Sequence, residues 1–139
     1  CNVCRVLGIV VVNWNTREEL RSCLRSLENR PTAEETRVVV VDNASRDGSA
    51  DLVRTEFPDV LLLAERANHG YARGNNLGLA RVEDADAVLL LNPDTEVPPG
   101  TLDAALAALR ADPARGVVSV RFVGLDGETQ PSVRGFPEY

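Results

Sequence analysis

The pattern of apolar and polar positions along this chain changes repeatedly between two periods. Short aliphatic runs, typical of buried strands, are each followed by a polar loop and then by apolar residues at helical spacing. The pattern predicts strands at residues 6–12, 37–41, 60–64, 87–91 and 116–120. It predicts helices at residues 17–29, 50–57, 70–82 and 101–111, the first with an apolar face of Leu20, Cys23, Leu24 and Leu27.

Strands and helices that alternate from end to end predict an α/β fold. We expect a doubly wound, mostly parallel sheet with right-handed crossovers and helices on both faces. Residues 121–130 predict a small β-hairpin near the C-terminus, turning at Asp126-Gly127. The chain has 139 residues and neither a repeat nor a linker, so residues 1–139 are interpreted as one domain.

Polar residues gather at the ends of the first four predicted strands. The carboxyl ends of parallel strands meet at one edge of a sheet, and open α/β sheets bind their ligands there. Asn and Asp side chains at this edge suit hydrogen bonding to a flat ring and a phosphate chain, and Trp14 offers a surface for stacking. An alternative is that Trp14 packs in the core. The four groups are 13–15, 42–43, 68–70 and 92–94.

The last of these groups, Asn92-Pro93-Asp94, follows an aliphatic run directly. Proline cannot donate to a strand ladder, so Pro93 ends the pairing and turns Asn92 and Asp94 out of the sheet. A carboxylate at this place suits Mg²⁺ or Mn²⁺, which takes one or two protein oxygens and completes its shell with phosphates and water. The alternative is an ordinary turn, since all three residue types are common in turns.

Composition narrows the class of partner. The net charge of −6 argues against nucleic acid, which requires a basic surface. All 15 basic residues are arginine. No apolar stretch is long enough for a transmembrane segment and no secretion signal is visible, so we expect a cytoplasmic protein. The odd number of cysteines, Cys1, Cys4 and Cys23, predicts free thiols.

The common phosphate-binding loops do not match. Gly70, Gly74 and Gly78 are four residues apart, unlike G-x-G-x-x-G, and a chain without lysine contains no Walker motif. These glycines therefore either let a helix pack closely on the sheet or let backbone amides approach a phosphate. The sequence therefore gives little support for interpreting the chain as a dehydrogenase or a nucleotide hydrolase.

Four segments in order, VVVNWN, VVVVDNASRDGS, NHGYARGNNLG and LLLNPDTEV, resemble the family-two glycosyltransferases with the GT-A fold. The resemblance is strongest to their bacterial rhamnosyltransferase-like branch. It implies an inverting, metal-dependent transfer from a nucleotide-diphosphate sugar, dTDP- or UDP-linked, to a glycan or lipid-linked acceptor in cell-wall polysaccharide biosynthesis. It also implies a cytoplasmic enzyme that can work at the inner face of the membrane.

The resemblance also assigns site residues by position. Trp14 and Asp42 would contact the base, and Asp94 would hold Mg²⁺ or Mn²⁺, with Asn92 standing where the family's D-x-D motif has its first aspartate. The complete nucleotide-binding set implied in this way is Val12, Trp14, Asn15, Asp42, Asn43, Asn68, Gly70, Asn75 and Asn92.

An inverting transfer needs a carboxylate base to deprotonate the acceptor. In the family this residue stands well after the metal motif, in an acceptor-binding half. No later acid of this chain matches it, so we expect the base beyond Tyr139 and interpret the chain as a donor-binding fragment with little turnover of its own. A noncatalytic sugar-nucleotide-binding module and a sugar nucleotidyltransferase remain alternatives.

Overall fold

The computed structural model describes residues 5–28 and 32–130. The chain divides into two compact units, Cys1–Asp103 and Ala104–Tyr139, and the described part of each is presented by itself. That residues 1–139 act as one domain stays a prediction.

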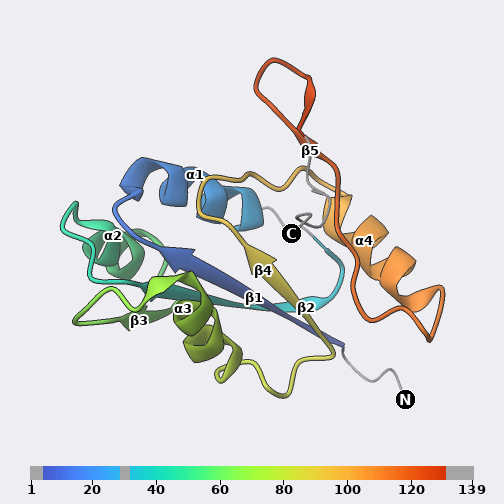
Figure 1. The fold of residues 1–139 in the computed structure, drawn as a ribbon, viewed down its shortest axis with the longest axis horizontal. Helices are drawn as coiled ribbons and strands as arrows, with labels where there is room; N and C mark the ends of the chain where they lie inside the picture. Colours follow the sequence, from blue (N-terminus) through green and yellow to red (C-terminus); the bar gives the residue numbers. More distant parts are fainter. Residues whose placement is uncertain (1–4, 29–31, 131–139) are drawn as a thin grey trace, which may run out of the picture. The chain divides into compact units, whose positions relative to one another are not determined.

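The first unit is built on a parallel sheet with strand order β3-β2-β1-β4 (Figure 1). Its strands are β1 (Val6–Asn13), β2 (Glu35–Asp42), β3 (Leu61–Ala64) and β4 (Ala87–Leu91). Its helices are α1 (Arg17–Glu28), α2 (Ser49–Glu56) and α3 (Gly70–Leu79), and α4 (Thr101–Arg110) crosses the boundary between the units. The predicted parallel α/β architecture is confirmed. The predicted end of the first helix at Asn29 lies outside the described residues.

The strand order creates a switch point beside β1. The chain moves outward from β1 to β2 and β3, then crosses back to place β4 on the other side of β1. α1 and α2 lie together on one side of the sheet and α3 lies on the other, as Figure 1 shows. In open α/β sheets, ligands bind in the crevice at the carboxyl ends of the strands flanking such a reversal. The fold therefore predicts a ligand site at the carboxyl ends of β1 and β4.

The core forms because the central strands are apolar on both faces, as expected for a covered parallel sheet. All eight residues of β1 are buried. On the face toward α3, Val10 and Val12 pack with Val39, Val41 and Val82. Alternate residues of β1 point to the opposite face, where α1 contributes its predicted apolar stripe, whose four members are all buried.

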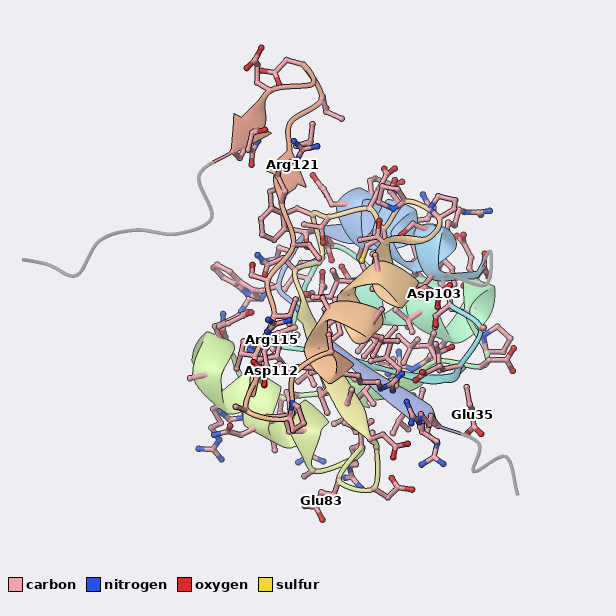
Figure 2. All side chains as sticks on the ribbon, turned by 90° about the vertical axis from the view of Figure 1, so that its right-hand side faces the viewer. Glu35, Glu83, Asp103, Asp112, Arg115 and Arg121 are labelled. Atoms are coloured by element: carbon pink, nitrogen blue, oxygen red, sulfur yellow. The ribbon has the colours of Figure 1, made fainter. Side chains whose placement is uncertain are left out.

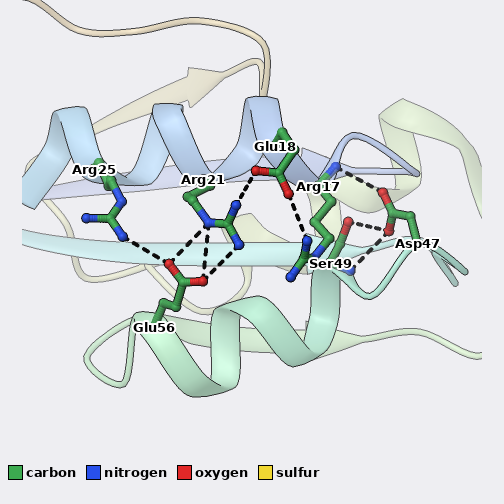
Figure 3. Close-up of polar contacts among 7 residues, drawn as sticks. All are labelled: Arg17, Glu18, Arg21, Arg25, Asp47, Ser49 and Glu56. Atoms are coloured by element: carbon green, nitrogen blue, oxygen red, sulfur yellow. Dashed lines mark hydrogen bonds and ion pairs between the residues drawn. The ribbon is translucent and has the colours of Figure 1, made fainter.

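Ion pairs link the outer surfaces of α1 and α2 (Figure 3). Arg21 contacts Glu56 at 2.9 Å, and Arg25 contacts the other oxygen of the same carboxylate at 3.1 Å. The hydrogen bond from Arg21, with the charges of both arginines, holds the pKa of Glu56 below its usual range. These groups are solvated, so we assign them orientation of the helix pair rather than much stability.

One carboxylate, that of Asp47, joins the starts of α1 and α2 (Figure 3). Its oxygens accept the backbone N–H groups of Arg17 at 2.9 Å and Ser49 at 3.0 Å, together with the Ser49 hydroxyl at 2.6 Å. Partial burial raises the pKa of Asp47, but the hydrogen bonds from Ser49 and Arg17 outweigh it and the pKa is lowered. Both helix starts are thereby fixed to one side chain.

The second unit contains the predicted hairpin. β5 (Phe122–Val123) pairs antiparallel with β6 (Thr129–Gln130), and Gly127 at the turn has a φ of 81°. The predicted strand at 116–120 is wrong: those residues have no strand pairing, and Val117 is 85% exposed. Their alternating pattern is compatible with a strand, but a strand exists only where a partner accepts its backbone hydrogen bonds.

Candidate functional site

The ends of β1 and β2 form a buried polar pair. The strands are in register, so that the last residue of β1, Asn13, lies opposite the last residue of β2, Asp42. The amide of Asn13 donates to Asp42 Oδ1 at 2.8 Å and to Ser45 Oγ at 3.1 Å. Thr16 donates its hydroxyl to Asn13 Oδ1 at 2.7 Å. With Asn13 fully buried and Asp42 2% exposed, these bonds satisfy polar groups that the sheet withdraws from water.

The two loops that leave this pair hold an unusual backbone shape. Asn15 and Ala44 have φ values of 54° and 60°, in the left-handed region that disfavours residues with a side chain. Ser45 closes the arrangement, because its N–H donates to Asp42 Oδ2 at 3.0 Å and its hydroxyl accepts the N–H of Asn15 at 2.8 Å. Arg46 N–H adds a 2.8 Å bond to Asn15 Oδ1. The two loops are therefore held together as one structure.

The start of α3 is attached to the end of β2. Asn43, 2% exposed, donates from Nδ2 to the carbonyl of Gly70 at 3.2 Å, while its Oδ1 has no partner among the described residues. Gly70 has a φ of 78° and donates its N–H to Asn68 Oδ1 at 2.8 Å. Asn75, also buried, donates to the carbonyl of Tyr71 at 3.0 Å. These contacts bring the predicted residues of the second and third strand ends together.

The end of β4 completes the same edge. β4 stops at Leu91, opposite Val11 of β1, and both Asn92 and Asp94 are exposed beyond it, as predicted from Pro93. Asn92 accepts the Tyr71 hydroxyl at 3.3 Å, and its carbonyl accepts the Thr95 hydroxyl at 2.7 Å. The 92–95 turn is thus tied both to α3 and to itself.

Asp94 fits a divalent cation with few protein ligands. Its carboxylate is exposed and makes no hydrogen bond or ion pair with any residue that the structure describes. Within residues 5–28 and 32–130, no group of three His, Cys, Asp or Glu side chains is placed to hold a metal ion. A single open carboxylate is compatible with Mg²⁺ or Mn²⁺ that takes its other ligands from phosphates and water, and incompatible with an all-protein cage.

Cys23 of α1 lies under this turn. Its thiol is buried 3.7 Å from the carbonyl of Asn92. Burial, followed by the negative charges of Asp94 and Glu96, raises the pKa of Cys23 to about 12. The prediction of a free thiol is confirmed for Cys23, whereas Cys1 and Cys4 lie outside the described residues.

Trp14 is 56% exposed at the end of β1, so the alternative of a core aromatic is wrong. Among the residues that the structure describes, the opposite edge of the sheet, marked by Glu35 and Glu83 in Figure 2, has no such concentration of amide side chains. Sequence reasoning missed Ser45, which frames the loop pair, and Tyr71, which bridges to Asn92. A signal for Ser45 was its place three residues after Asp42, where such hydroxyls and carboxylates close turns.

Most of this chain matches known proteins of one family. The profile of Glycosyl transferase family 2 matches residues 8–136. The N-acetylglucosaminyl-diphospho-decaprenol L-rhamnosyltransferase of Mycobacterium tuberculosis is 31% identical over 142 aligned positions, covering 95% of this chain and 46% of that protein. The low-salt glycan biosynthesis hexosyltransferase Agl10 of Haloferax volcanii is 33% identical, covering 69% of this chain and 32% of that protein. The chain thus spans less than half the length of these relatives.

Solved structures share the fold. The mannosyltransferase PcManGT of Pyrobaculum calidifontis, in complex with GDP-Man and Mn²⁺, superposes with a TM-score of 0.63 at 28% identity, over 77% of this chain and 32% of that one. S. aureus TarS in complex with UDP gives a TM-score of 0.63 at 20% identity, over 88% of this chain and 43% of that one. The GT-A architecture is confirmed. No helix in the described part of this chain has the length and apolarity to cross a membrane. The chain belongs to glycosyl transferase family 2 and is similar to its rhamnosyltransferases.

Proposed function

We propose that the protein transfers a sugar, with inversion, from a pyrimidine nucleoside diphosphate to a glycan or lipid-linked acceptor, with the help of a divalent cation. The observation that carries this proposal is the polar edge at the switch point, where buried Asp42 and exposed Trp14 lie on the strand ends leading to the open carboxylate of Asp94. A flat base and a diphosphate need these two kinds of surface.

The base end of the site would use Trp14 and Asp42. The indole face is available for stacking on the ring. Asp42 already accepts one bond on each oxygen, but a carboxylate accepts about four, so capacity remains for a pyrimidine imide N–H. The other predicted contacts lie in the last part of β1, in the segments that follow the four strands, and in α3: Val12, Asn15, Asn43, Asn68, Gly70, Asn75 and Asn92.

The phosphate end would use Asp94. Bound Mg²⁺ or Mn²⁺ would supply stabilisation of the negative charge that builds on the departing diphosphate. Asp94 would hold the cation, while Asn92 keeps the turn in place through its bonds to Tyr71 and Thr95, and Cys23 stays a neutral thiol beneath it. We keep the prediction that the base acting on the acceptor is not among these residues.

The test is calorimetry of the purified chain with UDP, dTDP and GDP, with and without Mn²⁺. We expect Mn²⁺ to strengthen pyrimidine diphosphate binding, and Asp94→Ala to remove that gain while leaving the melting temperature unchanged. Asp59→Ala is a matched control, because Asp59 is also exposed but precedes β3 at the opposite edge of the sheet.

Three other calorimetry results would count against parts of this proposal. Nucleotide binding that ignores both Mn²⁺ and Asp94→Ala would favour a noncatalytic binding module. Binding of GDP in preference to UDP and dTDP would contradict the assigned base. Absence of binding to any nucleotide would count against the proposed donor site in this chain.

A further inference from the structure

The helix that carries several predicted donor contacts, α3, packs against the sheet through glycines. A Cβ atom built on Gly74 would lie 2.8 Å from Val12 Cγ1, 3.2 Å from Val12 Cγ2 and 3.4 Å from Asn43 Nδ2. Carbon atoms normally pack at roughly 3.5–4.0 Å. A side chain at position 74 would therefore require either Val12 or α3 to move, and Val12, packed among the core valines, has little room to do so.

The close contact at Gly74 involves Val12 and Asn43, whereas those at Gly8 and Gly78 involve core valines. Val12 is the residue before the buried Asn13–Asp42 pair, and Asn43 is the residue after it. Asn43 in turn donates to the carbonyl of Gly70 at the start of α3. A displacement at Gly74 would be transmitted to the 68–71 segment through this bond.

Asn43 has little freedom to absorb such a displacement. It is 2% exposed, its single amide bond goes to Gly70, and its Oδ1 has no partner within the described part of the chain. Loss of the Gly70 contact would leave the whole buried amide unsatisfied, which is unfavourable. The close approach of α3 at Gly74 is what keeps that contact within hydrogen-bond distance.

We propose that Gly74 is a positioning residue of the donor site. Its lack of a side chain lets α3 approach the sheet and so sets the distance between residues 68–71 and Asp42. The proposal rests on the proposed function for the identity of the ligand, but not for the displacement itself. It goes beyond the packing role of a glycine because it predicts a loss of binding in a protein that is still folded.

The first variant is Gly74→Ala, with Gly8→Ala as its control. A Cβ on Gly8 would lie 2.7 Å from Val82 Cβ, a clash of the same kind, but near the start of β1 and away from the site. We expect both variants to be destabilised. Only Gly74→Ala should weaken UDP binding, by at least about tenfold, since displacements near 1 Å are enough to disrupt a ligand geometry.

The second variant removes the clash. Val12→Ala deletes the two methyl groups nearest to the new Cβ, so Gly74→Ala/Val12→Ala should recover the affinity measured for Val12→Ala alone. Alanine is also the better helix former, so the double variant keeps α3 intact. Failure of this rescue, or an equal affinity loss in Gly8→Ala, would overturn the proposal.

A ligand-free measurement separates this proposal from the proposed function. In ¹⁵N NMR spectra, Gly74→Ala should shift the Asn43 side-chain amide and the backbone amides of residues 68–71, and Gly8→Ala should leave them in place. If the wild-type chain binds no UDP, the proposed donor fails while these shifts still decide the role of Gly74. Unchanged resonances in Gly74→Ala would refute it.

Discussion

The buried pair of Asn13 and Asp42 gives the most direct test of how this site is held together. Asp42→Ala removes the acceptor of a 2.8 Å bond from Asn13 and of a 3.0 Å bond from Ser45 N–H. Hydrogen bonds to a charged group contribute roughly 1.5–3 kcal/mol each. Asn13 keeps its bond to Ser45 Oγ, and removal of a buried charge relieves desolvation, so we expect a net loss of about 2–4 kcal/mol in the free energy of unfolding.

The assay is urea denaturation of the wild type, Asp42→Ala, Asn13→Ala and the double variant. If the two side chains act as a pair, the double variant loses less than the sum of the single losses, with a coupling of about 1 kcal/mol or more. Asp51→Ala on α2 serves as the control, because Asp51 is exposed and its carboxylate pairs with Arg54, three residues further along the same helix. Additive losses at positions 13 and 42 would refute the reasoning.

Two further predictions concern titratable groups. Folding lowers the pKa of Asp47. The carboxylate therefore stabilises the folded protein at pH values above its ordinary pKa near 3.8, and this stabilisation is lost as the pH falls through the lower pKa of the folded state. Asp47→Asn should lower the melting temperature at neutral pH, and the difference from the wild type should disappear in acid. A melting-temperature gap that persists unchanged at low pH would contradict this. With a pKa of about 12, roughly one Cys23 thiol in ten thousand is ionised at pH 8, so peptide mapping should find Cys23 alkylated by iodoacetamide only after unfolding. Rapid alkylation of the native protein would show that the thiol is not buried as described.

The sequence was sufficient for the parallel sheet because each strand is a local apolar run and each end carries a visible polar break. It was insufficient at residues 116–120, where the same local pattern occurs without pairing. Strand pairing also explains why β2 begins at Glu35, two residues before the predicted start at residue 37. Glu35 and Thr36 are polar, yet they pair with Val6 and Leu7 of β1, because register extends a strand beyond its apolar part.

The position of the site on the sheet could be predicted from the sequence, whereas the contacts among its side chains could not. The end of β4 was indicated by Pro93, and the shared edge followed from parallel topology. The role of Tyr71 was not visible, because its contact with Asn92 joins residues 21 positions apart. Nor does a sequence reveal that Asn43 Oδ1 has no partner among the described residues, since that depends on what surrounds it in the fold.

The left-handed backbone at Asn15 and Ala44 has a consequence for binding. Alanine adopts this conformation at a cost of roughly 1–2 kcal/mol, which the surrounding hydrogen bonds offset during folding. The loop entropy is therefore lost when the chain folds rather than when a ligand arrives. A ligand at this edge meets a rigid, pre-organised surface, and differences in affinity between ligands there will be set by contacts rather than by loop ordering.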